Sequence, residues 1–241
     1  IRLHTRDLHW KLFANPMLYT GEAYMDGTLT VEDAGIYDFL DLASKNIGWR
    51  QPDHWLQKQF MTPLREAVRR LRQYNPAHRA RANVAHHYDL TSALYDLFLD
   101  SDRQYSCAYF QSPEDDLETA QLRKKRHLAA KLALQPGQRV LDIGSGWGGM
   151  GLYLARNEQV LVHGVTLSEE QHKLSNQRAA EAGLAGFVSF ALEDYQAVEG
   201  PFERIVSVGM FEHVGLNHYR EYFDKVRELL TDDGIAVVHT I

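Results

Sequence analysis

The sequence predicts an α/β protein in which helices cover both faces of a parallel sheet, preceded by a smaller, mainly helical domain. A buried-strand pattern runs directly into a glycine-rich turn at 139–149. From that turn to Ile241, short apolar segments alternate with amphipathic ones, a pattern typical of strand–helix units. Residues 1–75 lack this alternation. We therefore expect two domains, 1–75 and 76–241, with the boundary at Asn75–Pro76, where the proline disfavours helix.

Composition argues against several classes of protein. The chain has 241 residues, of which 44% are hydrophobic and 24% are charged, which is enough for a sizeable core. Its net charge of −6 argues against a nucleic-acid partner, because such proteins are usually basic. The single cysteine, Cys107, excludes an intrachain disulfide and fits a reducing compartment. No apolar run approaches the length of a membrane span.

The first domain is expected to contain two helices. Val31–Leu42 has apolar residues at helical spacing, whereas Gly21–Gly27 is typical of turns. A second helix begins at Pro63 and continues to Tyr74, with an apolar face and several arginines off that face. A basic amphipathic helix of this kind is able to lie on an anionic membrane surface. The alternative is an ordinary solvated helix that packs on the next domain.

Two clusters ahead of the glycine turn have both a structural and a functional interpretation. His86, His87 and Asp89 are metal-binding residue types, but sequence neighbours point in different directions and no second cluster has matching spacing. We therefore predict no metal site. Cys107 lies in a loop of small and aromatic residues. It is expected to be a small, buried apolar residue rather than a reactive thiolate, because no base neighbours it in the sequence.

The second domain is expected to contain a long helix followed by alternating strands and helices. Pro136–Gly137 ends the long helix, and a later helix is capped by Ser168 and Gly183. The predicted helices are 117–134, 149–157, 168–182 and 218–230, and the predicted strands are 139–143, 159–165, 187–191, 203–208 and 234–239.

Polar residues gather where these strands end. Because ligands of parallel sheets bind at the carboxyl ends of the strands, the residues at those ends should converge on one pocket. They are Asp142, Thr166, Glu193–Asp194, 209–212 and His239. The chain stops just after the fifth strand, and an uncovered edge would leave the sheet incomplete. We therefore expect the C-terminal part of the sheet to be missing from this chain.

The glycine turn fits more than one class of ligand. Gly144, Gly146 and Gly149 match the G-x-G-x-x-G dinucleotide fingerprint, which also expects an acid at the end of the second strand. That strand ends in His163–Thr166 with no acid, and Asp142 instead precedes the first glycine. A carboxylate there would repel a pyrophosphate but suit S-adenosylmethionine (SAM), which carries an ammonium and a sulfonium group. We favour a SAM site over a nicotinamide or flavin site or a structural turn.

Several motifs occur in order along nearly the whole chain. They are His87–Leu90, Tyr105–Phe110, Lys131–Gly137, Val140–Gly149, Gly164–Ser168 with Gln171, Arg204–Gly215 and His239–Ile241. On these residues the chain resembles the cyclopropane fatty acid synthase family of SAM-dependent methyltransferases. Gly21–Gly27 is similar to the amino-terminal part of the branch that modifies bacterial phospholipids. The resemblance implies a class I, Rossmann-like methyltransferase sheet. One departure is Ser145, where the family usually has cysteine.

The resemblance also implies which residues bind SAM. Tyr105 and Ser106 match contacts to the methionine end of SAM. Asp142, Gly144 and Gly146 match the glycine loop. The matches to the adenosine contacts are Thr166, Leu167 and Gln171, and those near the adenine edge are Glu193 and Asp194.

A bound bicarbonate ion is implied as well. The positions that match those holding it in the phospholipid-modifying enzymes are Cys107, Glu212, His239 and Ile241, of which Cys107 and Ile241 would act mainly through their backbones. The implied reaction transfers a methylene from SAM to the cis double bond of an unsaturated phospholipid acyl chain. Methyl transfer leaves a carbocation, and a base then removes a proton so that a cyclopropane ring closes. Aromatic faces stabilise cations, and the candidates are Tyr88, Tyr109 and Phe110.

Other outcomes stay open at the level of sequence. The same chemistry is able to end in a methyl-branched or methylene lipid, the same fold is able to methylate a small-molecule amine, and a non-catalytic fragment would only bind. The resemblance implies an enzyme in the cytoplasm, peripheral to the inner face of the membrane. The resemblance also implies that a homodimer is possible. No stretch of the sequence indicates an interface.

Overall fold

The computed structural model of the protein describes residues 1–47 and 92–241. The chain divides into two compact units, Ile1–Ala67 and Val68–Ile241. Two sequence predictions lie outside the described residues: the basic helix at 63–74 and the boundary at Asn75–Pro76.

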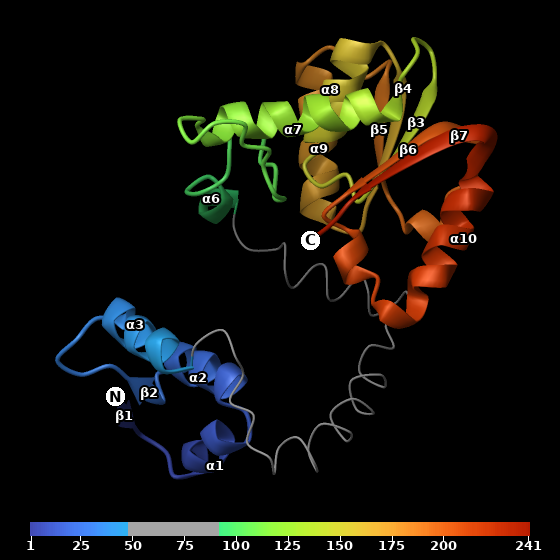
Figure 1. The fold of residues 1–241 in the computed structure, drawn as a ribbon. Coiled ribbons are helices and arrows are strands. Elements are labelled where there is room, and N and C mark those ends of the chain that lie inside the picture. Colours follow the sequence, from blue (N-terminus) through green and yellow to red (C-terminus); the bar gives the residue numbers. More distant parts are fainter. Residues whose placement is uncertain (48–91) are drawn as a thin grey trace. The chain divides into compact units, whose positions relative to one another are not determined.

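The first unit contains three helices and a small antiparallel pair of strands among its described residues (Figure 1). The strands β1 (Arg2–Leu3) and β2 (Leu29–Thr30) pair with each other, and the helices are α1 (Asp7–Ala14), α2 (Pro16–Met25) and α3 (Ile36–Ile47). Leu8, Ala23 and Leu29 form its small buried core.

Two sequence predictions for this unit need correction. The segment Gly21–Gly27 is mostly helix α2 rather than a turn, because Pro16 starts the helix and only Gly27 takes a positive φ, +72°. The helix predicted from Val31 begins later, at Ile36. The Gly35 N–H donates to the Asp38 carboxylate at 2.8 Å, which satisfies a free donor at the amino end of α3.

The second unit is a five-stranded parallel sheet with the order β5-β4-β3-β6-β7. Its strands are β3 (Arg139–Ile143), β4 (Leu161–Thr166), β5 (Val188–Leu192), β6 (Phe202–Val208) and β7 (Leu230–His239). This confirms the predicted α/β fold. The strand β7 begins four residues earlier than predicted, because its register against β6 shifts between Phe202 and Arg204. Residues 231–234 of β7 lie opposite Glu203 alone, as a bulge within the strand.

Helices cover both faces of this sheet (Figure 1). The helices α7 (Leu117–Leu132), α8 (Gly149–Glu158) and α9 (Glu169–Glu181) share one core cluster with the strands. Helix α10 (Tyr219–Leu229) shares the other cluster, centred on Leu141, Ile205 and Tyr222. The expected caps of α9 are present: Ser168 accepts a hydrogen bond from the Gln171 N–H, and Gly183 follows with φ +68°. A short helix, α6 (Ser92–Tyr95), precedes α7.

Candidate active site

The order in which the chain adds strands to the sheet reverses between β3 and β6. The chain runs outward from β3 through β4 to β5, and then returns to add β6 and β7 on the other side of β3. Such a switch point leaves a crevice at the carboxyl ends of the two central strands, where ligands of these sheets bind. The loops that follow β3 and β6 touch there, since a Cβ on Gly144 would lie 2.8 Å from the Met210 side chain. The candidate site therefore lies at this crevice.

Asp142 lies beneath the glycine loop with its side chain buried. It is the fourth residue of β3 and is 1% exposed. Burial raises its pKa to about 7, although a hydrogen bond from the Gly151 backbone N–H opposes the shift. The Oδ2 atom has no hydrogen-bond partner among the described residues. A buried acceptor without a partner is costly, so the loop is suited to a ligand that brings a donor or a positive charge.

Tyr105 and Ser106 reach the crevice from the segment between α6 and α7. A Cβ on Gly209, just after β6, would lie 3.3 Å from Ser106 Cβ and 3.7 Å from the Tyr105 carbonyl oxygen. The half-exposed Tyr105 ring packs 5.6 Å from the buried Tyr95 ring, which in turn lies 4.8 Å from Trp147 of the glycine loop. An aromatic cluster thus borders the glycine loop.

Glu212 and the end of β7 meet at the same edge. Thr240 Oγ1 donates to Glu212 Oε2 at 2.9 Å, and the Gly209 N–H donates to the His239 carbonyl at 3.0 Å. The Cβ position on Gly209 is 3.7 Å from Glu212 Oε1. Burial, together with the positive charge of Lys124, lowers the pKa of the His239 imidazole. His239 is therefore expected to be neutral at pH 7.

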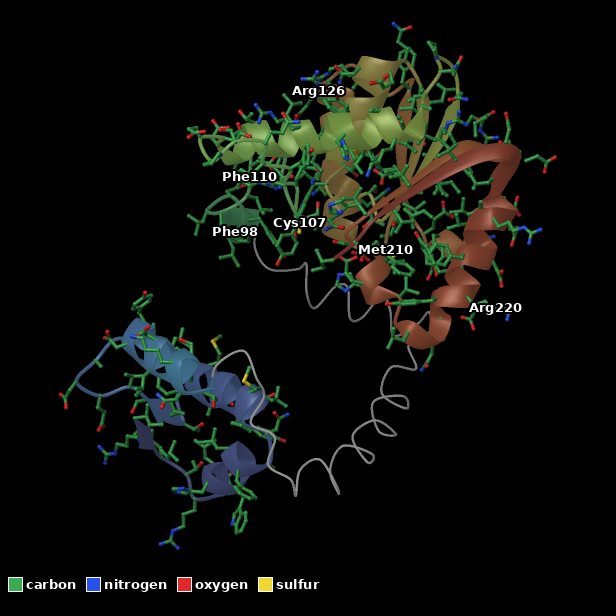
Figure 2. The ribbon with its side chains drawn as sticks, in the orientation of Figure 1. Phe98, Cys107, Phe110, Arg126, Met210 and Arg220 are labelled. Atoms are coloured by element: carbon green, nitrogen blue, oxygen red, sulfur yellow. The ribbon has the colours of Figure 1, made fainter. Side chains whose placement is uncertain are left out.

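Cys107 and Ile241 are both exposed. Figure 2 shows Cys107 on the segment between α6 and α7, and Met210 on the loop after β6. Cys107 was expected to be a small buried residue, and this expectation is wrong because its thiol faces solvent.

Thr166, Leu167 and Gln171 lie at the end of β4 and the start of α9. Thr166 Oγ1 donates to Gln171 Oε1 at 2.8 Å, and both side chains are buried. Leu167, which follows Thr166 in the sequence, is partly buried. This hydrogen bond fixes the turn that leads from the second strand into α9.

Glu193 and Asp194 are engaged in other contacts. The Glu193 carboxylate lies 3.1 Å from His163 Nε2, and both line a groove of about 560 Å³ that extends to Phe202 at the start of β6. Asp194 accepts a hydrogen bond from the Gln196 N–H at 3.0 Å. Glu193 follows Leu192, which pairs with Thr166 between β5 and β4, so Glu193 and Asp194 follow β5 at the same edge of the sheet as Thr166.

Several polar residues around the crevice were not singled out from the sequence. They are Asp102, Gln121, Lys124 and Arg178. Arg178 on α9 donates to the Trp147 carbonyl at 2.6 Å and also pairs with Asp102, which Lys125 contacts as well. Lys124 was part of an apparent charge run, but its spacing of four residues from Ala120 and from Leu128 places it on the buried face of α7.

Two features are absent from the described residues. No helix within 1–47 or 92–241 is long and apolar enough to span a membrane. The same residues contain no group of three or more His, Cys, Asp or Glu side chains placed to hold a metal ion. His86, His87 and Asp89 lie outside the described residues.

Comparison with known proteins gives the same fold. The family model described as mycolic acid cyclopropane synthetase matches residues 75–241. The chain belongs to this family. It is 41% identical over all 241 residues to the cyclopropane-fatty-acyl-phospholipid synthase of Escherichia coli K12, of which it spans 60%. It is 39% identical over 160 residues to cyclopropane mycolic acid synthase 1 of Mycobacterium tuberculosis, covering 66% of this chain and 56% of that protein.

Solved structures of cyclopropane synthases share the architecture. The synthase MmaA2 from Mycobacterium tuberculosis superposes with a TM-score of 0.65 at 35% identity, covering 69% of this chain and 57% of that one. The mycolic acid cyclopropane synthase CmaA1, solved in complex with SAH and CTAB, gives 0.64 at 36% identity with the same coverage. The predicted class I, Rossmann-like methyltransferase sheet is confirmed.

Proposed function

We propose that this family member transfers a methylene group from SAM to the cis double bond of an unsaturated phospholipid acyl chain and forms a cyclopropane. The observation that carries the proposal is the meeting of Ser106, Gly209, Glu212 and His239 beside the loop that covers Asp142. The 41% identity to the Escherichia coli cyclopropane-fatty-acyl-phospholipid synthase extends over the whole chain and supports the same reaction.

The residues at the crevice fit SAM. The buried Asp142 Oδ2 atom lacks a partner, and the SAM ammonium group would supply one. No atom lies within 4 Å of the position where a Cβ on Gly146 would stand, so the loop leaves room for a ligand there. The residues proposed to hold SAM are Tyr105, Ser106, Asp142, Gly144, Gly146, Thr166, Leu167 and Gln171, and the proposal extends to Glu193 and Asp194 at the adenine edge.

The proposed reaction depends mainly on how the alkene is positioned against the SAM methyl group. One alkene carbon bonds to the SAM methyl carbon as the carbon–sulfur bond breaks, so that SAH leaves and the other alkene carbon becomes cationic. Loss of a proton from the new methyl group then closes the ring. Because an alkene is a poor nucleophile, holding it in line is worth roughly 7–11 kcal/mol. Tyr109, stacked 4.9 Å from His127, and the exposed Phe110 are candidates to face the cation; Tyr88 lies outside the described residues.

Glu212 and His239 are proposed to hold bicarbonate, with backbone groups of Cys107 and Ile241. The buried His239 Nδ1 atom has no hydrogen-bond partner among the described residues, which fits an additional ligand at this place. When bound there, bicarbonate would supply the base for the released proton. The role of Glu212 is to orient, since Thr240 already holds one of its oxygens.

An acyl chain in a bilayer requires the enzyme to work at a membrane. The segment between α6 and α7 exposes large apolar side chains close to the crevice, a feature of lipid and partner contacts. They are Leu97, Phe98, Tyr105, Tyr109 and Phe110, and Figure 2 labels Phe98 and Phe110. We propose a cytoplasmic enzyme that binds peripherally to the inner face of the membrane. A homodimer is part of the proposal only by resemblance.

The test uses SAM labelled in its methyl group and vesicles of a cis-unsaturated phospholipid. We expect label in cyclopropane acyl chains. Glu212→Gln should lower product formation at least a hundredfold while leaving SAM affinity unchanged. Glu228→Gln, an exposed acid on α10 that pairs with Lys225, is the matched control and should behave as wild type. Full product formation by Glu212→Gln would refute the assignment of Glu212.

The same assay separates the alternative products. Label in a methyl-branched or methylene acyl chain would show that the carbocation is resolved differently. Label in an added amine, with none in lipid, would indicate a small-molecule methyltransferase and would refute the lipid substrate.

A further inference from the structure

Lys124 is a buried lysine in the middle of α7. Its side chain is 2% exposed, and lysine is almost never fully buried unless it is paired. Its Nζ atom donates to Ser106 Oγ at 2.8 Å and makes no other hydrogen bond among the described residues. An ammonium group has three donors, so Lys124 has donor capacity that the hydroxyl alone does not use.

The surrounding charges do not form an ion pair with this ammonium. The ionisable groups that act on it are Asp100, Asp102, Lys125 and Cys107, and its own charge acts on His239. The Asp102 carboxylate is occupied by Lys125 and Arg178, and Asp100 accepts the Gln104 N–H at 2.7 Å. Burial lowers the pKa of Lys124 to about 8. The charged form thus lacks a close counter-charge.

The Ser106 hydroxyl oxygen accepts the hydrogen bond from Lys124, so the hydroxyl proton does not point at Lys124. The Gln121 amide donates to the carbonyls of Gln104 and Ser106, each at 3.0 Å, which fixes the backbone. Because Lys124 has only donors, the Ser106 oxygen accepts from it, and the hydroxyl hydrogen is free to donate to another acceptor. The described residues give it none. Ser106 Cβ lies 3.3 Å from the Cβ position on Gly209, so the hydroxyl lies beside the crevice.

We propose that Lys124 and Ser106 form an oxyanion-binding pair at the crevice, in which Lys124 is a positioning residue that acts through the Ser106 hydroxyl. The ligand is a carboxylate-type anion, because a donor hydroxyl backed by a buried positive charge favours a negatively charged acceptor. The inference rests on the proposed function, which offers two sources of such an anion. One is the carboxylate of the SAM methionine end, and the other is bicarbonate.

Binding experiments test the pair without relying on product formation. Calorimetric titration in bicarbonate-free buffer would compare SAH with 5′-methylthioadenosine, which lacks the amino-acid carboxylate. If the methionine carboxylate is the anion, Lys124→Met should weaken SAH binding at least tenfold and leave 5′-methylthioadenosine binding unchanged. If bicarbonate is the anion, SAH binding should stay unchanged in Lys124→Met, and calorimetric titration of the SAH-bound protein with bicarbonate should show at least tenfold weaker bicarbonate binding.

Three variants make the result specific. Ser106→Ala should reproduce the Lys124→Met effect, and Lys124→Arg should restore part of the affinity because it keeps the charge. Arg126→Met, an exposed cation on the same helix, should behave as wild type. Unchanged anion dependence in Lys124→Met would overturn the proposal, as would equal weakening of SAH and 5′-methylthioadenosine.

The pH dependence gives a second readout. The ratio of anion affinities of the wild-type protein and Lys124→Met, in which the effect of Asp142 cancels, should be constant below pH 8 and fall above it as the Lys124 ammonium loses its proton. Lys124→Arg should abolish this decline, because arginine stays charged. Wild-type protein that binds SAH but modifies no lipid would refute the proposed function and would leave the Lys124 result standing.

Discussion

Asp142 and Lys124 are two buried ionisable groups whose pKa values shift in opposite directions. Burial raises the pKa of Asp142 to about 7 and lowers that of Lys124 to about 8. In both cases low dielectric surroundings disfavour the charged form. A ligand that carries both an ammonium group and a carboxylate, as SAM does, is suited to stabilise each charge. Burial of these two charges destabilises the free protein, and a bound ligand of this kind would reduce that cost.

The stability of the free protein should depend on Asp142. Because its folded pKa is raised from 3.8 to about 7, the stability contributed by the protonated carboxyl is fully present below pH 3.8 and is lost as pH rises to about 7. Asp142→Asn should remove this loss. The unfolding free energy of the wild-type protein should fall by on the order of 3 kcal/mol between pH 5 and pH 8. That of Asp142→Asn should not show this fall.

Denaturant titration at the two pH values, without ligand, measures the change. The same variant should bind SAH at least tenfold more weakly, since an amide does not offer a negative charge to the ammonium group. Parallel pH profiles for the variant and wild type would contradict the proposed burial of a titrating carboxyl.

Gly146 and Gly148 should respond differently to alanine. Both have positive φ values, +53° and +83°, which cost any L side chain energy. The Cβ of Gly148→Ala would lie 2.7 Å from Phe190, whereas that of Gly146→Ala meets open space. We expect Gly148→Ala to lose about 2 kcal/mol or more of unfolding free energy, and Gly146→Ala about 1 kcal/mol.

Gly183→Ala is the matched control for Gly146→Ala, because Gly183 also has a positive φ and open space but lies after α9. Both substitutions should lower the melting temperature similarly. Only Gly146→Ala should weaken SAH binding, by tenfold or more. Equal SAH affinity in the two variants would show that the space at Gly146 is not used by the ligand.

At the scale of the elements, one arginine joins three parts of the site. Arg178 of α9 holds the Trp147 carbonyl in the glycine loop and pairs with Asp102, which Lys125 of α7 also contacts. Asp102 lies three residues before Tyr105 on the same segment. The glycine loop, the Tyr105 segment and two helices are thereby fixed with respect to one another.

Removing this arginine should affect binding more than chemistry. Arg178→Met should raise the KM for SAM at least tenfold with a smaller change in kcat, because it loosens the loop and not the reacting groups. Arg178→Lys should recover part of the effect through the Asp102 contact. Arg156→Met, an exposed arginine on α8, serves as the control. A loss confined to kcat would contradict this positioning role.

Element types were predictable where apolar periodicity was strong, and boundaries were less so. The parallel strands and their helices follow the predicted order because β-branched runs and capping residues agree locally. The prediction failed at Gly21, where a glycine is tolerated inside α2, and at residues 231–233, which precede the predicted strand but belong to β7. In both places the fold overrides a local preference.

For the molecule as a whole, the carboxyl ends of the strands could be predicted to meet, and the supporting contacts could not. Parallel pairing fixes where Asp142, Thr166 and His239 end up once the strands are known. Arg178 and Asp102 are 76 positions apart, and no local pattern links them. Lys124 could have been found from its place on the apolar stripe of α7, although it stands within the basic run at 123–126.

The order of strands in the sheet has a consequence for how the protein folds. Strands β3, β4 and β5 are neighbours both in the chain and in the sheet, whereas the chain must return from β5 past β4 and β3 before β6 pairs with the other side of β3. Pairing between distant segments is slow compared with local pairing. We therefore expect the crevice between β3 and β6 to form late during refolding. A chain stalled with three strands paired would have its glycine loop but no opposite wall, and recovery of ligand affinity should lag behind recovery of helical signal.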